Sequence, residues 1–212
     1  MNYNLFIFDF DGTLADSADW MIRTFNDIAG THGLRRVSDS EIDMLRGRSN
    51  REIVSYLGVP AWRIPAIATD MRKRVAAAAD QIKLFAKVDR LLRTLRDAGV
   101  QIAIVSSNSE ANVRKILGLE NAGYVHHYDC GANLFGKARK LRRVMKRAGV
   151  EPHATLCIGD ETRDIEAARE VGAACAAVTW GYATVQVLAD HKPTLLFGSI
   201  EELMEKIGLR VT

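Results

Sequence analysis

The chain has 212 residues, 48% hydrophobic and 26% charged, with 29 lysine and arginine residues against 26 aspartate and glutamate residues. This apolar fraction suffices for a buried core and excludes a disordered chain. No apolar run approaches the roughly 18–20 residues of a membrane span, and we expect no signal peptide. Three cysteines outside any CxxC pair favour a cytoplasmic location over a disulfide framework or a zinc site. The net charge of +3 gives no reason to expect nucleic acid but leaves anionic small molecules open.

The first predicted strand, at residues 5–9, ends in two closely spaced carboxylates. Asp9 closes the strand, Asp11 follows two residues later, and Gly12 then permits a sharp turn. Paired acids at a strand end suit a hard divalent cation, most plausibly Mg²⁺, and either acid could act as nucleophile or general acid. An exposed Asp-Gly turn is the weaker alternative, because no hairpin partner follows.

Residues 16–83 are predicted to be an inserted helical module. The next strand of the main pattern begins only near residue 101, whereas a crossover between parallel strands needs about a dozen residues. Helix-start signals inside the insert are Ser38 with Glu41, Ser49 with Glu52, and Pro60. We therefore expect a core of residues 1–15 and 84–212 and an α-helical cap of residues 16–83.

After the insert, amphipathic helices alternate with short apolar strands. Helical spacing over 87–98, 138–148 and 161–171 is followed each time by a glycine and then by an apolar segment. The predicted strands of this part are 101–106, 155–159, 174–178 and 194–197. Because these strands are apolar at consecutive positions, both faces of the sheet must be buried. The pattern predicts an α/β fold with a doubly wound, mainly parallel sheet.

Polar residues follow the strand at 101–106. The hydroxyls of Ser106 and Ser107, with Asn108 and the backbone N–H groups at the next helix start, can hold a phosphate oxygen. Asn108 or Ser109 could equally serve as the N-cap of that helix. This segment alone therefore leaves phosphate binding and helix capping open.

Two further carboxylates follow the strand at 155–159. Asp160 lies at its end and Asp164 one helical turn later, so both can face one cavity. Helix-dipole stabilisation is an alternative that explains Asp164 better than Asp160. Three or four carboxylates at one sheet edge would repel one another without a cation, so the set favours a metal site.

A lysine is expected beside such a site, to neutralise both nucleophile and substrate. Lys137 stands at the start of its helix, at the correct edge of the sheet. The other basic residues of 137–147 are better interpreted as a solvated helix face. Lys140, one turn after Lys137, remains an alternative for the same position.

These motifs together resemble the haloacid dehalogenase-like superfamily. The segment DFDGT after the first strand, Ser106, Lys137 and the segment GDETRD follow the order and spacing of its four motifs. The resemblance covers essentially the whole chain, and the helical insert resembles the C1 cap of that family. Within the family, the chain is most similar to phosphoglycolate phosphatase-like hydrolases. The expected core is therefore Rossmann-like.

The resemblance implies a reaction and roles for the residues. Asp9 would be the nucleophile that forms an aspartyl-phosphate, and Asp11 would protonate the leaving group and then deprotonate water. Ser106 and Lys137 would bind phosphoryl oxygens. The dehalogenase branch carries tyrosine or a similar residue where Asp11 stands, so Asp11 favours phosphate chemistry.

The resemblance also implies one Mg²⁺ ion. Its ligands would be Asp9, the backbone carbonyl of Asp11, Asp160 and Asp164, the last directly or through water. Phosphoryl transfer is mostly positioning and charge neutralisation, which such a cation and a lysine supply.

The cap is expected to select the substrate. Arg46 and Arg48 lie in a segment that resembles the specificity loop of the family's cap, and they could bind an anionic substrate. Surface arginines without a specific partner are the alternative.

The preferred hypothesis is a Mg²⁺-dependent phosphatase of a small phosphorylated metabolite such as 2-phosphoglycolate. A phosphomutase or phosphotransferase acting on sugar phosphates would share the same core residues. A non-enzymatic protein that binds RNA or an acidic partner through residues 137–148 lacks a nucleic-acid motif. We expect no nucleic acid and no membrane as partners, and either a monomer or a homodimer.

Overall fold

A computed structural model describes residues 3–48, 50–131 and 136–207. These residues form a six-stranded sheet in the order β5-β4-β1-β6-β7-β8, and every strand pair in it is parallel. The strands are β1 (Leu5–Phe8), β4 (Gln101–Val105), β5 (His127–Asp129), β6 (Thr155–Gly159), β7 (Ala174–Val178) and β8 (Leu195–Phe197). The predicted doubly wound, mainly parallel α/β sheet is confirmed.

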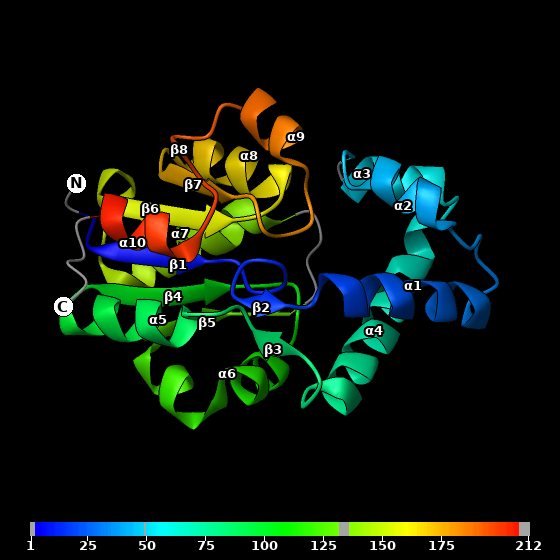
Figure 1. Ribbon diagram of the computed structural model, residues 1–212, viewed down its shortest axis with the longest axis horizontal. Helices are drawn as coiled ribbons and strands as arrows, with labels where there is room; N and C mark the ends of the chain where they lie inside the picture. The colour runs from blue at the N-terminus through cyan, green and yellow to red at the C-terminus, as the bar shows by residue number, and fades with distance from the viewer. Residues whose placement is uncertain (1–2, 49, 132–135, 208–212) are drawn as a thin grey trace.

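Helices cover both faces of this sheet (Figure 1). One face packs against α5 (Val88–Asp97), α6 (Glu110–Tyr124) and α10 (Ile200–Lys206). The other packs against α7 (Lys137–Ala148), α8 (Thr162–Val171) and α9 (Val185–Asp190).

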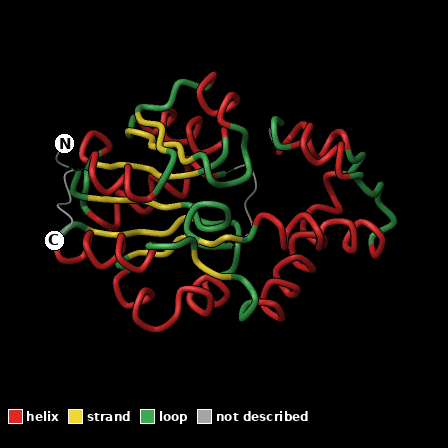
Figure 2. The backbone as a smooth tube through the Cα atoms, viewed as in Figure 1, coloured by secondary structure: helices red, strands yellow, loops and turns green. Residues whose placement is uncertain are grey.

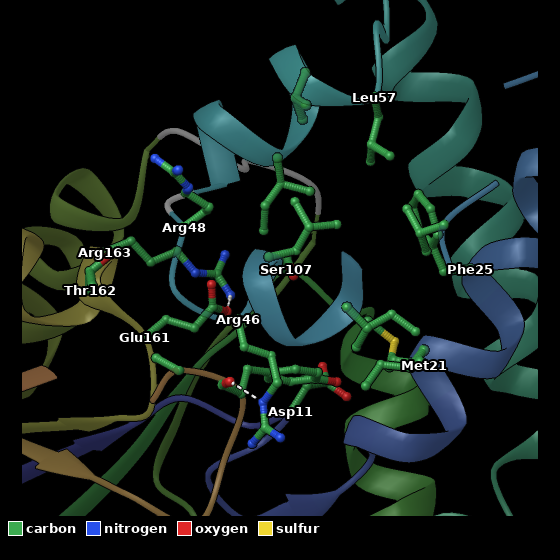
Figure 3. Close-up of a pocket in the computed structure, with 18 of the residues that line it drawn as sticks. Asp11, Met21, Phe25, Arg46, Arg48, Leu57, Ser107, Glu161, Thr162 and Arg163 are labelled. Atoms are coloured by element: carbon green, nitrogen blue, oxygen red, sulfur yellow. Dashed lines mark hydrogen bonds and ion pairs between the residues drawn. The ribbon is translucent and has the colours of Figure 1, made fainter. Parts of the chain in front are cut away.

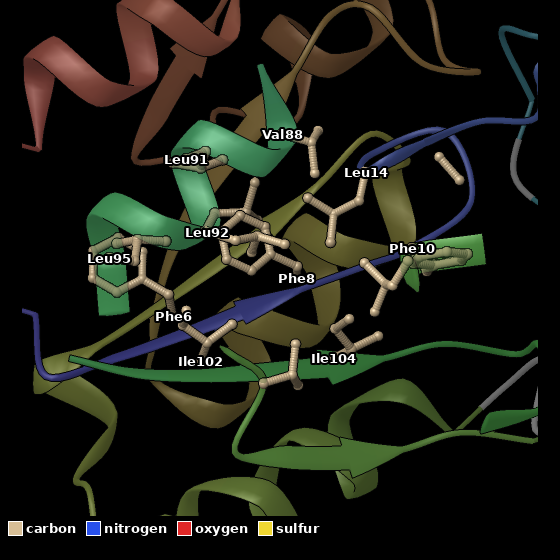
Figure 4. Packing of buried hydrophobic residues seen from close by; sticks show 14 of the residues in the cluster. Phe6, Phe8, Phe10, Leu14, Val88, Leu91, Leu92, Leu95, Ile102 and Ile104 are labelled. Carbon is tan, nitrogen blue, oxygen red and sulfur yellow. The ribbon is translucent and has the colours of Figure 1, made fainter. Parts of the chain in front are cut away.

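Strand β1 lies in the centre of the sheet and is buried on both sides. Phe6 and Phe8 point to the cluster that includes Leu91 and Leu95 of α5 (Figure 4), whereas Leu5 and Ile7 belong to the opposite cluster. Successive side chains of a strand point to opposite faces. This is why a central strand must be apolar at every position, as the sequence is here.

Strand β5 has no counterpart among the predicted strands. It consists of His127, Tyr128 and Asp129, and it pairs with β4 at the edge of the sheet. An edge strand with polar residues at both ends lacks the apolar run that marks the other strands. The helices predicted at 87–98, 138–148 and 161–171 are present as α5, α7 and α8.

The inserted segment forms a separate group of helices beside the sheet (Figures 1 and 2). It contains α1 (Ala18–Thr31), α2 (Asp39–Leu45), α3 (Asn50–Tyr56), a 3₁₀ turn (Ala61–Arg63) and α4 (Ile64–Ala78). The short strands β2 (Ala15–Asp16) and β3 (Lys83–Leu84) pair antiparallel where the chain enters and leaves this group. This pairing supports the division into a core (1–15 and 84–212) and a cap (16–83), which stays a prediction.

Local signals explain two of the helix starts in the cap. The capping box at Ser38 is present, and the Glu41 carboxylate accepts the Ser38 backbone N–H at 2.8 Å. The box predicted at Ser49 lies outside the described residues. Pro60 precedes the 3₁₀ turn, so the helix expected from it begins as α4 only at Ile64. Within the described ranges, no helix is long and apolar enough to cross a lipid bilayer.

The strand order reverses beside β1. From β1 the chain proceeds to β4 and β5 on one side, and it then returns to β6, β7 and β8 on the other. In open α/β sheets, ligands bind at the carboxyl ends of the strands at such a switch point. Asp9 follows β1 and Asp160 follows β6, and both strands point toward the cap (Figure 1).

Candidate active site

Three buried carboxylates meet at the switch point. Oxygen atoms of Asp9, Asp160 and Asp164 all lie within 4.8 Å of one another. The backbone brings them together, because the Asp9 N–H donates to Ile158 O of β6 at 2.8 Å, and α8, which carries Asp164, begins at Thr162. Asp9 Oδ2 and Asp164 Oδ1 are buried, and their charged partners are Lys137 and, for Asp9, Arg163. Clustered hard carboxylate oxygens suit Mg²⁺, so these residues fit the predicted metal site.

The nucleophile candidate Asp9 is held in one orientation. Its Oδ1 accepts the Phe10 N–H at 2.8 Å, whereas Oδ2 lies 2.8 Å from Lys137 Nζ. Burial would raise the pKa of Asp9, but the charges of Lys137 and Arg163 outweigh burial and lower it. Asp9 is therefore ionised, as a nucleophile must be.

The two candidate lysines have different partners. Lys137 Nζ forms ion pairs with Asp9 and Asp164. Lys140 is also buried, but its Nζ donates to backbone carbonyls, Ser106 O and Gly131 O, each at 2.7 Å. The geometry therefore favours Lys137 over Lys140 as the lysine of the site. Lys140 therefore does not belong to the solvated face predicted for most of the basic residues of 137–147.

Asp11 lies beside the carboxylate cluster but is not part of it. Its Oδ1 accepts from Ser17 Oγ at 3.3 Å, and its Oδ2 accepts from Asn108 Nδ2 at 3.4 Å. Burial and the neighbouring charge of Asp9 raise the pKa of Asp11 to about 6. Because the Asp11 side chain is outside the cluster, its predicted contact with the metal is limited to its backbone carbonyl.

Asp160 is surrounded by donors and by glycines. Its Oδ1 accepts from Thr13 Oγ1 at 2.7 Å, and its Oδ2 accepts from the Tyr182 N–H at 2.8 Å. A Cβ atom on Gly12 or Gly181 would collide with Asp160 Oδ2. Burial, followed by the charges of nearby carboxylates, raises the pKa of Asp160 well above its usual value. A bound cation would offset this repulsion.

The segment after β4 contributes polar groups to the same edge. Ser106 is buried, and its Oγ accepts the Asn108 N–H at 3.0 Å, which leaves the hydroxyl proton free for another acceptor. Ser109 is the N-cap of α6 and accepts the Asn112 N–H at 3.2 Å. The choice between Asn108 and Ser109 as cap is thereby decided, and Asn108 contacts Asp11 instead.

A cavity of ≈ 340 Å³ lies between the core and the cap (Figure 3). Its core side includes Asp11, Ser107 and Arg163. Its cap side is mainly apolar, with side chains such as Phe25 of α1 and Leu57 after α3. The volume lies in the range of small-molecule sites.

The two cap arginines line this cavity but already have protein partners. Arg46 donates to Tyr182 O at 2.9 Å and to Gly181 O at 3.1 Å, and thereby joins the cap to the loop after β7. Arg48 pairs with Glu52 one turn later at 3.1 Å. Their predicted contact with an anionic substrate stays a prediction.

A family model described as haloacid dehalogenase-like hydrolase matches residues 6–178. The chain belongs to this family. The hydrolase is also 33% identical over 204 residues to a phosphoglycolate phosphatase of Synechococcus elongatus, with 95% of each chain covered. It is 27% identical to the tyrosine-protein kinase PtkA of Mycobacterium tuberculosis (strain H37Rv), covering 97% of this chain and 72% of that one.

Solved structures share the fold. A predicted phosphatase from Clostridium acetobutylicum superposes with a TM-score of 0.83 at 22% identity, covering 98% of this chain and 99% of the other. The family match and the Synechococcus relative identify the hydrolase as a phosphatase of the phosphoglycolate phosphatase-like type, a phosphoric monoester hydrolase.

Several residues at the site were not singled out from the sequence of the hydrolase. Arg163 and Glu161 lie between Asp160 and Asp164, so their position in the GDETRD segment was an available signal. No sequence signal pointed to Tyr182, because it lies in the loop after β7 and contacts Asp160 only through its backbone N–H. Thr13, which binds Asp160 from the first motif, could have been inferred from the DFDGT segment.

Proposed function

We propose that the hydrolase is a Mg²⁺-dependent phosphatase that cleaves a small phosphomonoester through an aspartyl-phosphate on Asp9. The observation that carries this proposal is the buried Asp9 carboxylate, paired with Lys137 at 2.8 Å and clustered with Asp160 and Asp164. The name of the Synechococcus relative supports a substrate of the 2-phosphoglycolate type.

Mg²⁺ would be held by Asp9, Asp160 and Asp164, with the backbone carbonyl of Asp11 as a further ligand. When bound, it supplies positive charge to the phosphoryl oxygens and to the crowded carboxylates. Lys137 provides a second positive charge, and its ion pairs with Asp9 and Asp164 fix the position of its amine.

In the first step, an Asp9 carboxylate oxygen forms a bond to phosphorus while the bond from phosphorus to the leaving oxygen breaks. Asp11, which lines the cavity, gives its proton to that leaving oxygen. In the second step, water attacks phosphorus, Asp11 takes the water proton, and the bond between Asp9 and phosphorus breaks. Asn108 and Ser17 hold the Asp11 carboxylate through both steps.

The phosphoryl group would be bound by the segment after β4 together with Lys137. The Ser106 hydroxyl is already an acceptor for the Asn108 N–H and so can turn its proton toward a phosphoryl oxygen. Ser107 lines the cavity next to it. The donors of this segment are uncharged hydroxyl groups, and they come from a part of the site without the clustered carboxylates.

A phosphotransferase is the second candidate, because the PtkA relative is named a kinase. Phosphatase and transferase share the first step and differ in whether water or another hydroxyl attacks Asp9-bound phosphorus. A sugar hydroxyl would find few partners on the apolar cap side of the cavity. We therefore favour hydrolysis.

The test is phosphate release from p-nitrophenyl phosphate and from 2-phosphoglycolate, with Mg²⁺ and with EDTA. We expect activity that requires Mg²⁺ and that falls at least about 10³-fold in Asp9→Asn, because the nucleophile is lost. Asp97→Asn, at an exposed position on α5, is the matched control and should retain activity. Undiminished phosphate release by Asp9→Asn would contradict the proposal.

A further inference from the structure

Arg163 is the second residue of α8 and lies between two of the clustered carboxylates in sequence. Its Nη2 is 3.5 Å from Asp9 Oδ2 and 2.5 Å from Glu161 Oε1. The side chain is 22% exposed and lines the cavity, where Figure 3 shows it beside Glu161. Its Nε is buried and has no hydrogen-bond partner. Arg163 is thus held by an ion pair with Glu161, and its Nε donor is unused.

The acidic groups around Asp9 outnumber the basic ones, so a positive charge from Arg163 is useful there. Five acidic residues stand at the site, Asp9, Asp11, Asp160, Glu161 and Asp164, whereas Lys137 and Arg163 are the nearby basic partners of Asp9. An incoming phosphoryl group adds further negative charge. A cation already fixed beside the nucleophile does not have to reorganise when that charge arrives.

Its reach matches the position of a transferred phosphoryl group. A phosphorus atom bonded to Asp9 Oδ2 carries its remaining oxygens outward from the carboxylate. Arg163 Nη2 already lies 3.5 Å from that Oδ2, so those oxygens come within hydrogen-bonding distance of the guanidinium. The planar fork of arginine donors suits phosphate oxygens.

We propose that Arg163 binds a phosphoryl oxygen during transfer, as a second cation beside Lys137, with its guanidinium held by Glu161. This inference rests on the proposed phosphatase function and adds a residue to it. Charge balance for Asp9 alone would be met by Lys137 at 2.8 Å, and it would leave the buried Nε of Arg163 without a role.

The experiment compares Arg163→Gln and Arg163→Lys with the wild type. The matched control is Arg169→Gln, on the same helix, because Arg169 is exposed and donates to the carbonyl of His191. Two quantities are measured with Mg²⁺ present: kcat for p-nitrophenyl phosphate, and the Kd of inorganic phosphate by isothermal titration calorimetry. Circular dichroism and thermal melting check that each variant folds.

We expect Arg163→Gln to lower kcat about 10²-fold, as removal of one transition-state donor does, and to weaken phosphate binding at least about tenfold. Arg163→Lys should recover part of both, because it restores the charge but not the fork. The Mg²⁺ concentration for half-maximal activity should not rise in Arg163→Gln, because the lost cation competed with the metal for Asp9.

Three outcomes would overturn the inference. Unchanged kcat and phosphate Kd in a folded Arg163→Gln would leave Arg163 only a structural role. A higher Mg²⁺ requirement with unchanged phosphate Kd would make it a support of the metal site instead. A wild-type protein that releases no phosphate would refute the proposed function itself, which separates that failure from a failure of Arg163 alone.

Discussion

Lys137 and Lys140 stand one helical turn apart on α7 at the sheet edge, where Lys140 is buried and Lys137 is partly buried. Lys137 contacts carboxylates of the site, whereas Lys140 donates to Ser106 O and Gly131 O, and so ties the segment after β4 to the segment after β5. The same type of side chain therefore pairs with carboxylates at one position and with backbone carbonyls at the other. Only the partners distinguish them.

Exchange of each lysine should separate these roles. Lys140→Met leaves buried backbone carbonyls without their donor, so we expect the free energy of unfolding to fall by about 1–3 kcal/mol. Lys137→Met removes the cation beside Asp9, so we expect kcat to fall at least about 10²-fold while the fold persists. Urea unfolding and p-nitrophenyl phosphate turnover measure the two effects. Equal losses of activity without any loss of stability would contradict the assignment.

The cap helices and the loop after β7 meet around the cavity. Helices α1 to α4 and their connections contribute mainly apolar side chains, and Arg46 links the end of α2 to the backbone of Gly181 and Tyr182. The same loop contacts Asp160 through the Tyr182 N–H. The cap therefore contributes most of the apolar wall of the cavity, and the loop after β7 connects it to the carboxylate cluster.

The apolar wall predicts which leaving groups are accepted. Phenyl phosphate should have a kcat/KM at least about tenfold higher than glucose 6-phosphate, because sugar hydroxyls would lose water without gaining partners there. Phosphate release from both compounds under the same Mg²⁺ concentration measures this. A preference for the sugar phosphate would contradict this role of the apolar wall.

Gly181, in the loop after β7, leads to a second prediction about this region. Gly181→Ala would drive a Cβ into the Asp160 carboxylate, so we expect at least a tenfold loss of activity and a higher Mg²⁺ requirement. Gly58→Ala, in the cap, is a control: no atom lies near its added Cβ, and its φ of +63° makes any cost one of stability. Normal Mg²⁺ dependence in Gly181→Ala would argue against Asp160 as a ligand.

At the scale of the whole molecule, folding itself gathers the carboxylates. Asp9 is far from Asp160 and Asp164 in the chain, and the three carboxylates reach one edge because β1 and β6 are neighbours in the sheet. Their mutual repulsion is unfavourable for the folded state, and the proposed Mg²⁺ ion would offset it. Metal binding and stability would then be coupled.

This coupling predicts a shift in thermal unfolding. At a Mg²⁺ concentration 100 times its Kd, the folded state gains about 2.7 kcal/mol, which corresponds to a rise in Tm of roughly 5–10 °C for a chain of this size. Asp160→Asn should abolish the shift, whereas Asp97→Asn should keep it. Differential scanning calorimetry provides the measurement, and an equal shift in Asp160→Asn would place the metal elsewhere.

Local patterns were enough to predict much of the fold. Consecutive apolar residues marked β1, β4, β6 and β7, and glycines marked the ends of α5, α7 and α8. These features depend on residues near one another in sequence. Strand β5 was missed because three residues at a sheet edge, two of them polar, carry no such pattern.

The sequence by itself determined the class of fold and the acidic residues that end β1 and β6, since each follows from local spacing and strand ends. Only the tertiary structure decided that Lys137 rather than Lys140 faces Asp9, and that Arg163 and Tyr182 reach the carboxylates. The physical reason is the same in each case. Which of several equivalent side chains becomes a partner depends on distances across the packed sheet edge, and a pattern along the chain does not contain those distances.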